Sequence, residues 1–442
     1  MDDALDVAKR AVAYATAAGA NEAEATYVVA DRFSAEARGA ELAKLERSVG
    51  RTLTLRVFRE GGRATLTTTD LTPAGLEAFA REAVDAARYV EPDPNAGLPV
   101  AAAGAAAPGL DLFADDVPAK PPEAKIAAAL ELERTIRAAD ARIVNSSGSR
   151  VADAATTVAL ANSHGFAGTY ATTQAQYGSS PIARDGAEKR TSSYGTAARS
   201  YAALQSVDAV AREAARRTVA MIGARKPVTA RCPVIFERDV ASSVLGEIFS
   251  ALSAANVAAG NSFFAGRIGE RLGSSLATLV DDGRLPGGLG SSPFDAEGVP
   301  TRRTVVFENG TLRTFLYDTY YGRRLGAAST GNAASGGIGP NNFYLAPGAR
   351  NLDELIATTP RGVLVLETIG FATESVTGTY SRGARGFAIE GGELAYPIDE
   401  FTIAGNLVEM LAALDGVASD LIFDQAIVSP SFRIAEMTVS GS

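Results

Sequence analysis

Apolar and polar residues alternate with two different periods along the first part of the chain. Apolar residues recur at helical spacing over 4–18 and again from residue 73, where Thr72 can cap a helix and Pro73 occupies its first position. Residues 25–30, 52–58 and 64–69 instead alternate residue by residue, with a pair of glycines at 61–62 between the last two segments. The pattern predicts two helices with strands and a β-hairpin between them.

This pattern stops at residues 91–122, which hold seven prolines and little periodicity, so we expect a surface connector there. Beyond it, residues 123–139 and 207–222 have helical spacing, whereas residues 143–198 alternate. An antiparallel meander is therefore predicted for 143–198, with turns at Ser147-Gly148, His164-Gly165 and Asp185-Gly186.

Residues 228–442 begin with a predicted strand at 233–236 and a helix from Val240, which Asp239 can cap and Gly260 can end. Strands dominate the rest, with hairpin turns at 308–310 and 391–392 and short helices near 318–325 and 406–413. We therefore expect an α+β fold, with an N-terminal helix and antiparallel-sheet region followed by a strand-rich mixed C-terminal domain. The expected parts are an N-terminal α/β domain at 1–90, a linker at 91–122, a middle α+β segment at 123–227 and the C-terminal domain at 228–442.

Charge and composition argue against several classes of function. The 442 residues carry 42 Lys and Arg against 51 Asp and Glu, and the net charge of −9 disfavours direct binding to nucleic-acid phosphates. The single histidine, His164, cannot provide the two imidazoles of a classical zinc hydrolase site, and the single cysteine, Cys232, excludes an intramolecular disulfide. Neither a signal peptide nor a membrane span is evident, so a cytoplasmic protein without membrane contact is expected.

Single residues with reactive side chains have simple structural interpretations. His164 could act as a general base, but its turn context favours local hydrogen bonds. Cys232 lies at the start of an apolar strand, where a thiol usually behaves as a small buried hydrophobe. The sequence contains no serine-hydrolase, P-loop or Rossmann signature.

Two groups of charged residues are candidates for binding. Four acids could offer oxygen ligands to a hard cation, although solvated loop carboxylates are the simpler interpretation: Asp281, Asp282, Asp295 and Glu297. Four arginines could clamp a carboxylate such as a peptide terminus, although surface charge is the simpler interpretation: Arg302, Arg303, Arg382 and Arg385.

Four segments, spread over nearly the whole chain, resemble the TldD/PmbA family on its PmbA (TldE) branch. They are residues 19–58, ANSHGFAGTY at 161–170, the long segment 261–326 that begins NSFFAGRIGERLGSS, and TIAGNLVEMLAALDGVASD at 402–420. STGNAAS at 329–335 adds to the third match.

The resemblance implies a chain without catalytic metal. TldD-type subunits of this family are zinc peptidases with an HExxxH helix just ahead of the segment that corresponds to 261–269. Counting back from Gly260 places the two histidines at Leu245 and Ser250 and the glutamate at Gly246, which offer neither imidazole nor carboxylate. The late cysteine ligand of TldD-type subunits is also missing from residues 420–430. The resemblance thus implies that this chain binds no cofactor and that the zinc belongs to a partner.

We therefore expect the accessory subunit of a heterodimeric TldD/TldE-type zinc metallopeptidase, not catalytic alone, that acts on unfolded or leader peptides. The family has also been named a modulator of DNA gyrase, but the acidic balance argues against holding DNA. Two alternatives stay open: a metal-independent hydrolase using His164 or the acids near Asp281, and a homodimeric, noncatalytic protein that captures extended peptides at a sheet edge.

Contacts with peptide or partner are expected from aromatic residues and arginines of the C-terminal domain. Core packing is the simpler interpretation of the aromatic ones. The candidates are Phe263, Phe264, Phe315, Tyr317, Tyr320, Tyr321, Arg302, Arg303 and Arg382.

Overall fold

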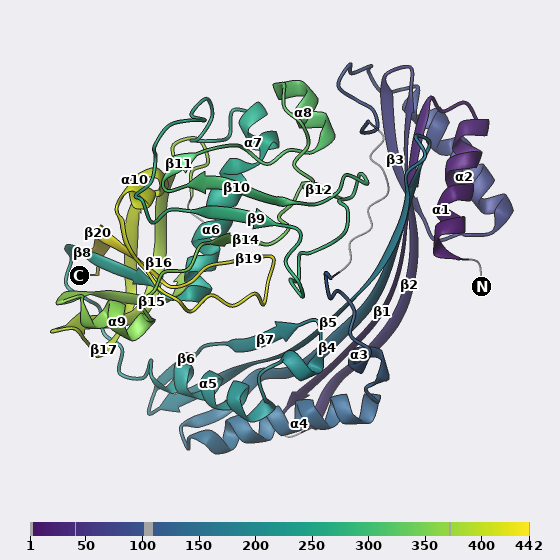
Figure 1. Cartoon of the computed structure of the whole chain (residues 1–442). Coiled ribbons are helices and arrows are strands. Elements are labelled where there is room, and N and C mark those ends of the chain that lie inside the picture. The colour runs from purple at the N-terminus through teal and green to yellow at the C-terminus, as the bar shows by residue number, and fades with distance from the viewer. Residues whose placement is uncertain (1–2, 40, 101–108, 371–372, 442) are drawn as a thin grey trace.

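The computed structural model describes residues 3–39, 41–100, 109–370 and 373–441 and confirms the α+β class (Figure 1). The first half forms one antiparallel sheet in the order β3-β2-β1-β4-β5-β6, with β7 also paired to β5. Strands from both sides of the proline-rich segment share this sheet, because β1 pairs with β2 and with β4. Its strands are β1 (Glu22–Arg38), β2 (Glu41–Arg59), β3 (Gly62–Thr68), β4 (Ile143–Asn162), β5 (Ala167–Asp185), β6 (Glu188–Thr191) and β7 (Tyr194–Ala198).

Helices cover one face of this curved sheet at its two ends (Figure 1). α1 (Ala4–Ala17) and α2 (Pro73–Ala87) pack against β1 to β3, and α4 (Pro122–Ala139) and α5 (Val207–Val219) pack against β1, β4 and β5. Thr72 caps α2 through its side chain, as predicted. The other face of the sheet is turned toward the second half of the chain (Figure 1). Two short elements, α3 (Asp116–Ala119) and the 3₁₀ helix η1 (Tyr201–Ala203), complete this half.

The second half places α6 (Arg238–Leu252) between two sheets. One sheet has the order β17-β16-β15-β8-β20-β18, in which β17 also pairs with β20, and the other has the order β11-β10-β9-β14-β19. The largest core of the molecule joins α6 to both sheets, with Phe236, Phe264 and Phe307 fully buried. The strands are β8 (Ala230–Phe236), β9 (Leu279–Asp282), β10 (Arg303–Glu308), β11 (Thr311–Leu312), β12 (Ala333–Ala334), β13 (Gly337–Ile338), β14 (Phe343–Leu345), β15 (Arg361–Ile369), β16 (Thr379–Glu390), β17 (Glu393–Asn406), β18 (Leu414–Val417), β19 (Ile427–Val428) and β20 (Phe432–Ser440). The further helices are α7 (Ala254–Ala258), α8 (Thr319–Leu325), α9 (Leu352–Ala357) and α10 (Leu407–Ala412).

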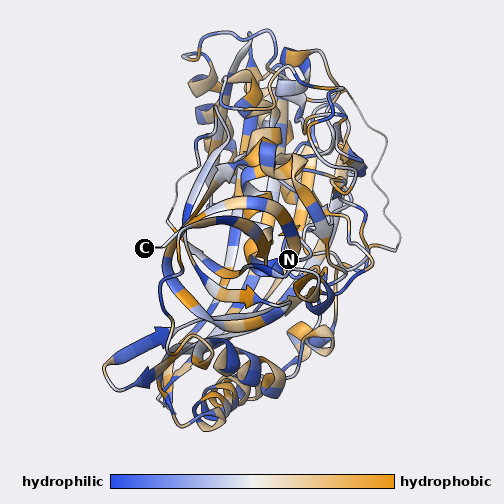
Figure 2. Ribbon diagram, turned by 90° about the vertical axis from the view of Figure 1, so that its left-hand side faces the viewer, coloured by the Kyte–Doolittle hydropathy of each residue, from blue (hydrophilic) through white to orange (hydrophobic). Residues whose placement is uncertain are grey.

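Hydrophobic and hydrophilic residues are mixed along most elements (Figure 2), as expected of helices and strands with one buried and one exposed side. Within the described ranges, no helix is long and apolar enough to cross a membrane.

The predicted meander is confirmed as β4 to β7, but the turn at Ser147-Gly148 is wrong. β4 runs through this pair, and its register with β5 shifts between Ser146 and Ser149. Gly148 has φ of +140°, so a local irregularity that only glycine adopts easily replaces the turn.

The limits of α6 also differ from the prediction. Glu237, not Asp239, is the N-cap, and the Glu237 carboxylate accepts a hydrogen bond from the Asp239 N–H at 3.0 Å. The helix ends at Leu252 and not near Gly260, because Ser253 is extended and Ala254 donates its N–H to the Leu316 carbonyl at 2.9 Å. A bond to a neighbouring strand-like segment thus overrides the helical pattern of the sequence.

Candidate functional site

α6 carries the three positions at which the family resemblance places metal chemistry. The Leu245 side chain is 2% exposed and lies in the main core. Ser250 is exposed, and its hydroxyl accepts a hydrogen bond from Asn256 at 3.1 Å. Gly246, between them, is half-buried and has no side chain. Positions five residues apart on an α-helix are separated by about 140° around its axis, so Leu245 and Ser250 point to different sides.

Zinc does not fit these residues. Leu245 and Gly246 offer no ligand atom, and a serine hydroxyl is not among the usual zinc ligands. In the parts of the chain that the structure describes, no three or more His, Cys, Asp or Glu side chains form a group that could hold a metal ion.

Glu247, the carboxylate next to Gly246, is already bound. The Arg382 guanidinium from β16 forms an ion pair with it and donates to the Gly370 carbonyl and, at 3.2 Å, to the Thr373 hydroxyl. Arg382 is only 8% exposed, and it ties β16, Gly370 and Thr373 to α6. The prediction that Arg382 carries ordinary surface charge is therefore wrong.

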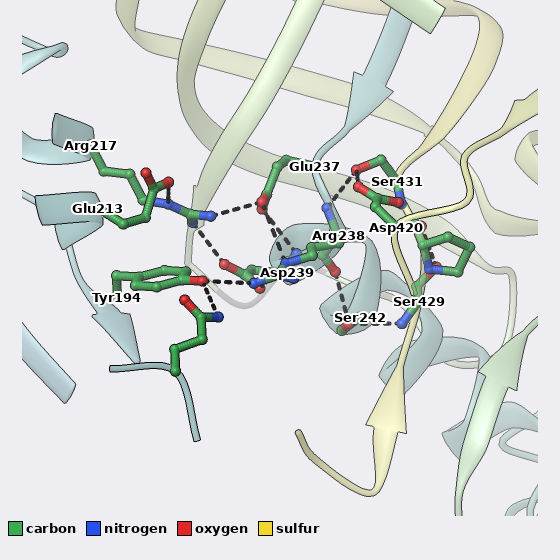
Figure 3. A network of polar contacts seen from close by, with 12 residues as sticks. Tyr194, Glu213, Arg217, Glu237, Arg238, Asp239, Ser242, Asp420, Ser429 and Ser431 are labelled. Carbon is green, nitrogen blue, oxygen red and sulfur yellow. Dashed lines mark hydrogen bonds and ion pairs between the residues drawn. The ribbon is translucent and has the colours of Figure 1, made fainter. Parts of the chain in front are cut away.

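The N-terminus of α6 is joined to the first half of the chain by a network of charged residues (Figure 3). Arg217 of α5 reaches Glu237 at 2.9 Å and Asp239 at 2.7 Å, and it also binds Glu213 of its own helix at 2.8 Å. The Arg217 guanidinium lies 4.6 Å from the centroid of the Tyr194 ring in β7. The Tyr194 hydroxyl in turn accepts from Arg238 at 3.3 Å, so α5, β7 and α6 meet at one point.

The segment in which the family resemblance places a metal-ligating cysteine, residues 420–430, packs against the same helix end. Asp420 accepts hydrogen bonds from the Ser431 N–H at 2.8 Å and from its hydroxyl at 2.7 Å. The Ser431 hydroxyl accepts from the Arg238 N–H, and Ser242 of α6 accepts from the Ser429 N–H, both at 3.0 Å. Serine hydroxyls and one aspartate thus fix this segment to α6 (Figure 3).

A polar cleft opens beside this network, between the sheet of the first half and the loop before β19. Its volume is about 620 Å³, and a second cavity of about 320 Å³ adjoins it, sharing Arg150 and Gln176. Gly178 of β5 and Gly195 of β7, which are cross-strand partners, lie on its wall. This cleft was not predicted from the sequence, although an isolated glycine in an alternating strand often marks a close approach to backbone or ligand.

The four acids expected in solvated loops are instead buried. Asp281 lies in β9 and accepts hydrogen bonds from Asn332 at 2.7 Å and from the side-chain and backbone N–H groups of Asn341, both at 2.9 Å. Asp295 binds the backbone N–H groups of Glu297, Val299 and Ala333. Burial raises the pKa of Asp281 to about 6 and that of Asp295 to about 7. Asp282 is also buried, and its carboxylate accepts from the Arg284 N–H at 2.8 Å.

Glu297 belongs to a second buried contact between the two halves. Arg56 of β2 binds Glu24 of β1 at 2.7 Å and Glu297 at 3.0 Å, and Glu297 also accepts the Thr319 N–H at 2.9 Å. Burial raises the pKa of Glu24 to about 7, against the opposing effect of the Arg56 charge. Arg56 and Glu24 were not singled out from the sequence, where they are ordinary polar residues of alternating strands.

His164 and Cys232 show no arrangement for catalysis. The His164 ring nitrogens lie 3.0 Å from the Glu22 carboxylate and 3.1 Å from the Pro99 carbonyl, which agrees with the turn role expected from the sequence. Burial raises the pKa of the Cys232 thiol, which disfavours the reactive thiolate.

The aromatic residues expected at a contact surface lie mostly in the core. Four of them are buried and lack the exposure that a partner surface requires: Phe263, Phe264, Phe315 and Tyr317. Tyr321 packs partly against the same core, and the Tyr320 hydroxyl donates to Asp93 at 2.6 Å. Arg302 and Arg303 are exposed; Arg302 donates to the Ser329 carbonyl and Arg303 lies 3.9 Å from Asp282. No single surface unites these residues.

Sequence and structure comparisons agree on the relatives of this chain. Sequence models of the first, central and C-terminal domains of the PmbA/TldA metallopeptidases match residues 23–87, 115–222 and 229–441. Metalloprotease PmbA of Escherichia coli O157:H7 is 32% identical over 92% of this chain and 90% of its own length. The Haemophilus influenzae metalloprotease PmbA homolog is also 32% identical, over 98% and 95% of the two chains. A Bacteroides thetaiotaomicron crystal structure linked to modulation of DNA gyrase has a TM-score of 0.93 at 26% identity and covers both chains completely.

Proposed function

Since the chain belongs to the PmbA/TldD family of metallopeptidases, we propose that it is the metal-free accessory subunit of a heterodimeric zinc metallopeptidase. In this assembly a TldD-type partner holds the zinc and performs hydrolysis. The substrates are unfolded or leader peptides, and this chain contributes its rigid scaffold and cleft.

The observation that carries the proposal is the residue chemistry of α6. Leu245 is packed in the core, Gly246 has no side chain, and Glu247 is paired with Arg382, so these three positions offer nothing to activate a water. The helix is nevertheless firmly held, by its Glu237 cap and by Arg217 from the first half. A well-supported helix with no reactive group at the positions where the resemblance places metal chemistry is what a structural subunit requires.

The test is cleavage of an unfolded, fluorescently quenched peptide by this chain alone, by a TldD-type chain alone and by the mixture, each with and without a zinc chelator. Chelator-sensitive cleavage that requires the mixture would support the accessory role. Cleavage by this chain alone, unaffected by chelator, would overturn it.

A His164→Ala variant is the matched control for the hydrolase alternative. His164 is exposed in a turn, so the substitution is expected to leave the fold intact. In the mixture, His164→Ala is expected to behave like the unaltered chain. If this variant abolished cleavage, whether by the chain alone or by the mixture, His164 would be assigned a catalytic role and the proposal would fail.

A further inference from the structure

We propose that the cleft between the sheet and the loop before β19 binds an extended, unfolded peptide segment that carries lysine or arginine. The inference rests on the proposed function for the origin of the peptide and extends it by giving this chain a substrate-binding site of its own. Four observations support it: the size of the cleft, its glycine pair, the free edge of β7 and the charge of its walls.

The cleft has the size and position of a ligand site. About 620 Å³ falls within the usual range of about 300–1,000 Å³ for ligand-binding clefts, and the adjoining cavity lengthens it along the sheet. The walls come from both halves of the chain, with β4, β5 and β7 on one side and Asp239, Asp424 and Gln425 on the other. An elongated space of this kind suits an extended chain better than a compact ligand.

The glycine pair leaves main chain exposed inside the cleft. Gly178 and Gly195 face one another across β5 and β7 in the same register line as Arg150 of β4 and Glu36 of β1. A side chain on Gly195 would meet the Tyr177 carbonyl at 2.8 Å, whereas one on Gly178 would find no atom closer than 3.6 Å. The space above Gly178 is therefore open, and small neighbours keep it so: Ser147, Ser180, Ser193, Thr196 and Ala197.

β7 offers hydrogen-bonding groups on its outer edge. Among the described residues it pairs with β5 alone, so every second residue directs its N–H and C=O away from the sheet. An extended peptide can bind such an edge through its own main chain, which does not depend on its sequence.

The charge of the walls selects the side chains of the peptide. Of the charged residues that line the cleft, Glu36, Asp239 and Asp424 are acidic and only Arg150 is basic. Arg217 partly neutralises Asp239, at 2.7 Å, and Asp424 lies on the same side of the cleft as Asp239. This balance disfavours nucleic acid and other phosphate ligands and favours a cationic segment.

The experiment measures fluorescence anisotropy of two labelled, unstructured peptides with the full-length chain in the absence of any partner. One peptide is rich in glycine, serine and lysine, and the other has glutamate in place of each lysine. The lysine peptide is expected to bind at least tenfold more tightly at low salt. Equal binding of both peptides, or tighter binding of the glutamate peptide, would overturn the charge argument.

Gly178→Phe fills the cleft without straining the backbone and is expected to weaken binding of the lysine peptide at least tenfold. Gly50→Phe in β2 is the matched control, because Gly50 is exposed, has open space within 4 Å of where a Cβ would lie and is outside the cleft. Unchanged binding by a folded Gly178→Phe chain would overturn the assigned site. If Gly178→Phe does not fold, Gln176→Arg is the second variant, because it adds a positive charge to the cleft. It is expected to weaken binding of the lysine peptide several-fold. Unchanged affinity of this variant for the lysine peptide would equally overturn the proposal.

Failure here is distinguishable from failure of the accessory role. The binding measurement contains no partner and no zinc, whereas the cleavage measurement requires both. Partner-dependent cleavage without any binding by this chain alone would overturn the cleft assignment and leave the accessory role standing.

Discussion

Two of the charged contacts between the halves of the molecule differ in exposure and balance. In the Arg56 contact, one arginine lies between Glu24 and Glu297, whose side chains are only 4% and 5% exposed. In the Arg217 contact, one arginine binds Glu213, Glu237 and Asp239, and the Asp239 side chain is 41% exposed and also lines the cleft. The first contact is closed and the second borders open space.

This difference separates a structural role from a functional one. A buried arginine with two carboxylates carries a large desolvation cost, so each member depends on the others being present. A half-exposed network costs less to disturb, because water can replace a lost partner. The Arg56 contact therefore fixes the position of the two halves relative to each other. The Arg217 contact holds the start of α6 and leaves one wall of the cleft accessible.

The largest effect is expected when the closed contact loses its cation. Arg56→Met leaves Glu24 and Glu297 buried without a counter-charge and should lower the free energy of unfolding by about 3–5 kcal/mol. Urea denaturation followed by circular dichroism measures it. Arg47→Met is the matched control, since Arg47 pairs with Asp31 at an exposed site, and a clearly smaller loss is expected there. Similar losses for both variants would show that the Arg56 contact is not structurally distinct.

The aromatic residues of the same interface should come next. Phe294 is buried with its ring centroid 5.0 Å from that of Phe166 and 5.1 Å from that of Tyr170, across the two halves. Phe294→Ala is expected to lower the free energy of unfolding by about 3 kcal/mol, since it removes these contacts and leaves a cavity. Phe113→Ala, at a half-exposed position, should cost clearly less in the same urea titration. A loss at Phe294 no greater than at Phe113 would contradict a tightly packed interface.

A smaller effect is expected at the open contact. Arg217→Met removes charged hydrogen bonds to Glu237 and Asp239, and we expect a loss of about 2 kcal/mol. The same change removes the nearer of two arginines from Asp239, which keeps only Arg238 at 3.5 Å, so binding of a lysine-rich peptide should tighten while stability falls. Opposite signs in thermal unfolding and peptide anisotropy would sharpen the contrast between the two contacts. Parallel losses in both would indicate that Arg217 only supports the fold.

The sequence predicted the elements better than the contacts between them. Thr72 and Pro73 mark the start of α2 because helix starts depend on local hydrogen bonds, and the alternation over 143–198 marks the meander for a similarly local reason. Ser147-Gly148 was predicted as a turn, because glycine with positive φ occurs both in turns and in irregular positions within strands. Local pattern alone does not distinguish them.

The site depended on pairings that are distant in sequence. Arg56 and Glu297 are separated by 241 residues, and Arg217 and Asp239 belong to different halves, so no spacing rule brings them together. The acids at 281–297 were expected in solvent because their segment is rich in glycine and proline. The asparagines that bury Asp281 are Asn332 and Asn341, some 50 to 60 residues later in the chain. Only the family resemblance indicated that α6 belongs to the candidate site.

The smallest effect is expected from the pH dependence of stability at the closed contact. In the folded chain burial raises the pKa of Glu24 to about 7, whereas in the unfolded chain the pKa of this carboxyl has its ordinary value of 4.5. The folded state therefore binds the extra proton between these values, and the stability from this group is full below pH 4.5 and lost as the pH rises through 7. Glu24→Gln cannot titrate, so the free energy of unfolding of this variant should rise relative to that of the unaltered chain as the pH increases from 5 to 8. Asp295, whose pKa is also raised to about 7, should preserve part of the slope. Urea titrations at several pH values measure the two slopes, and parallel slopes would show that Glu24 stays ionised beside Arg56.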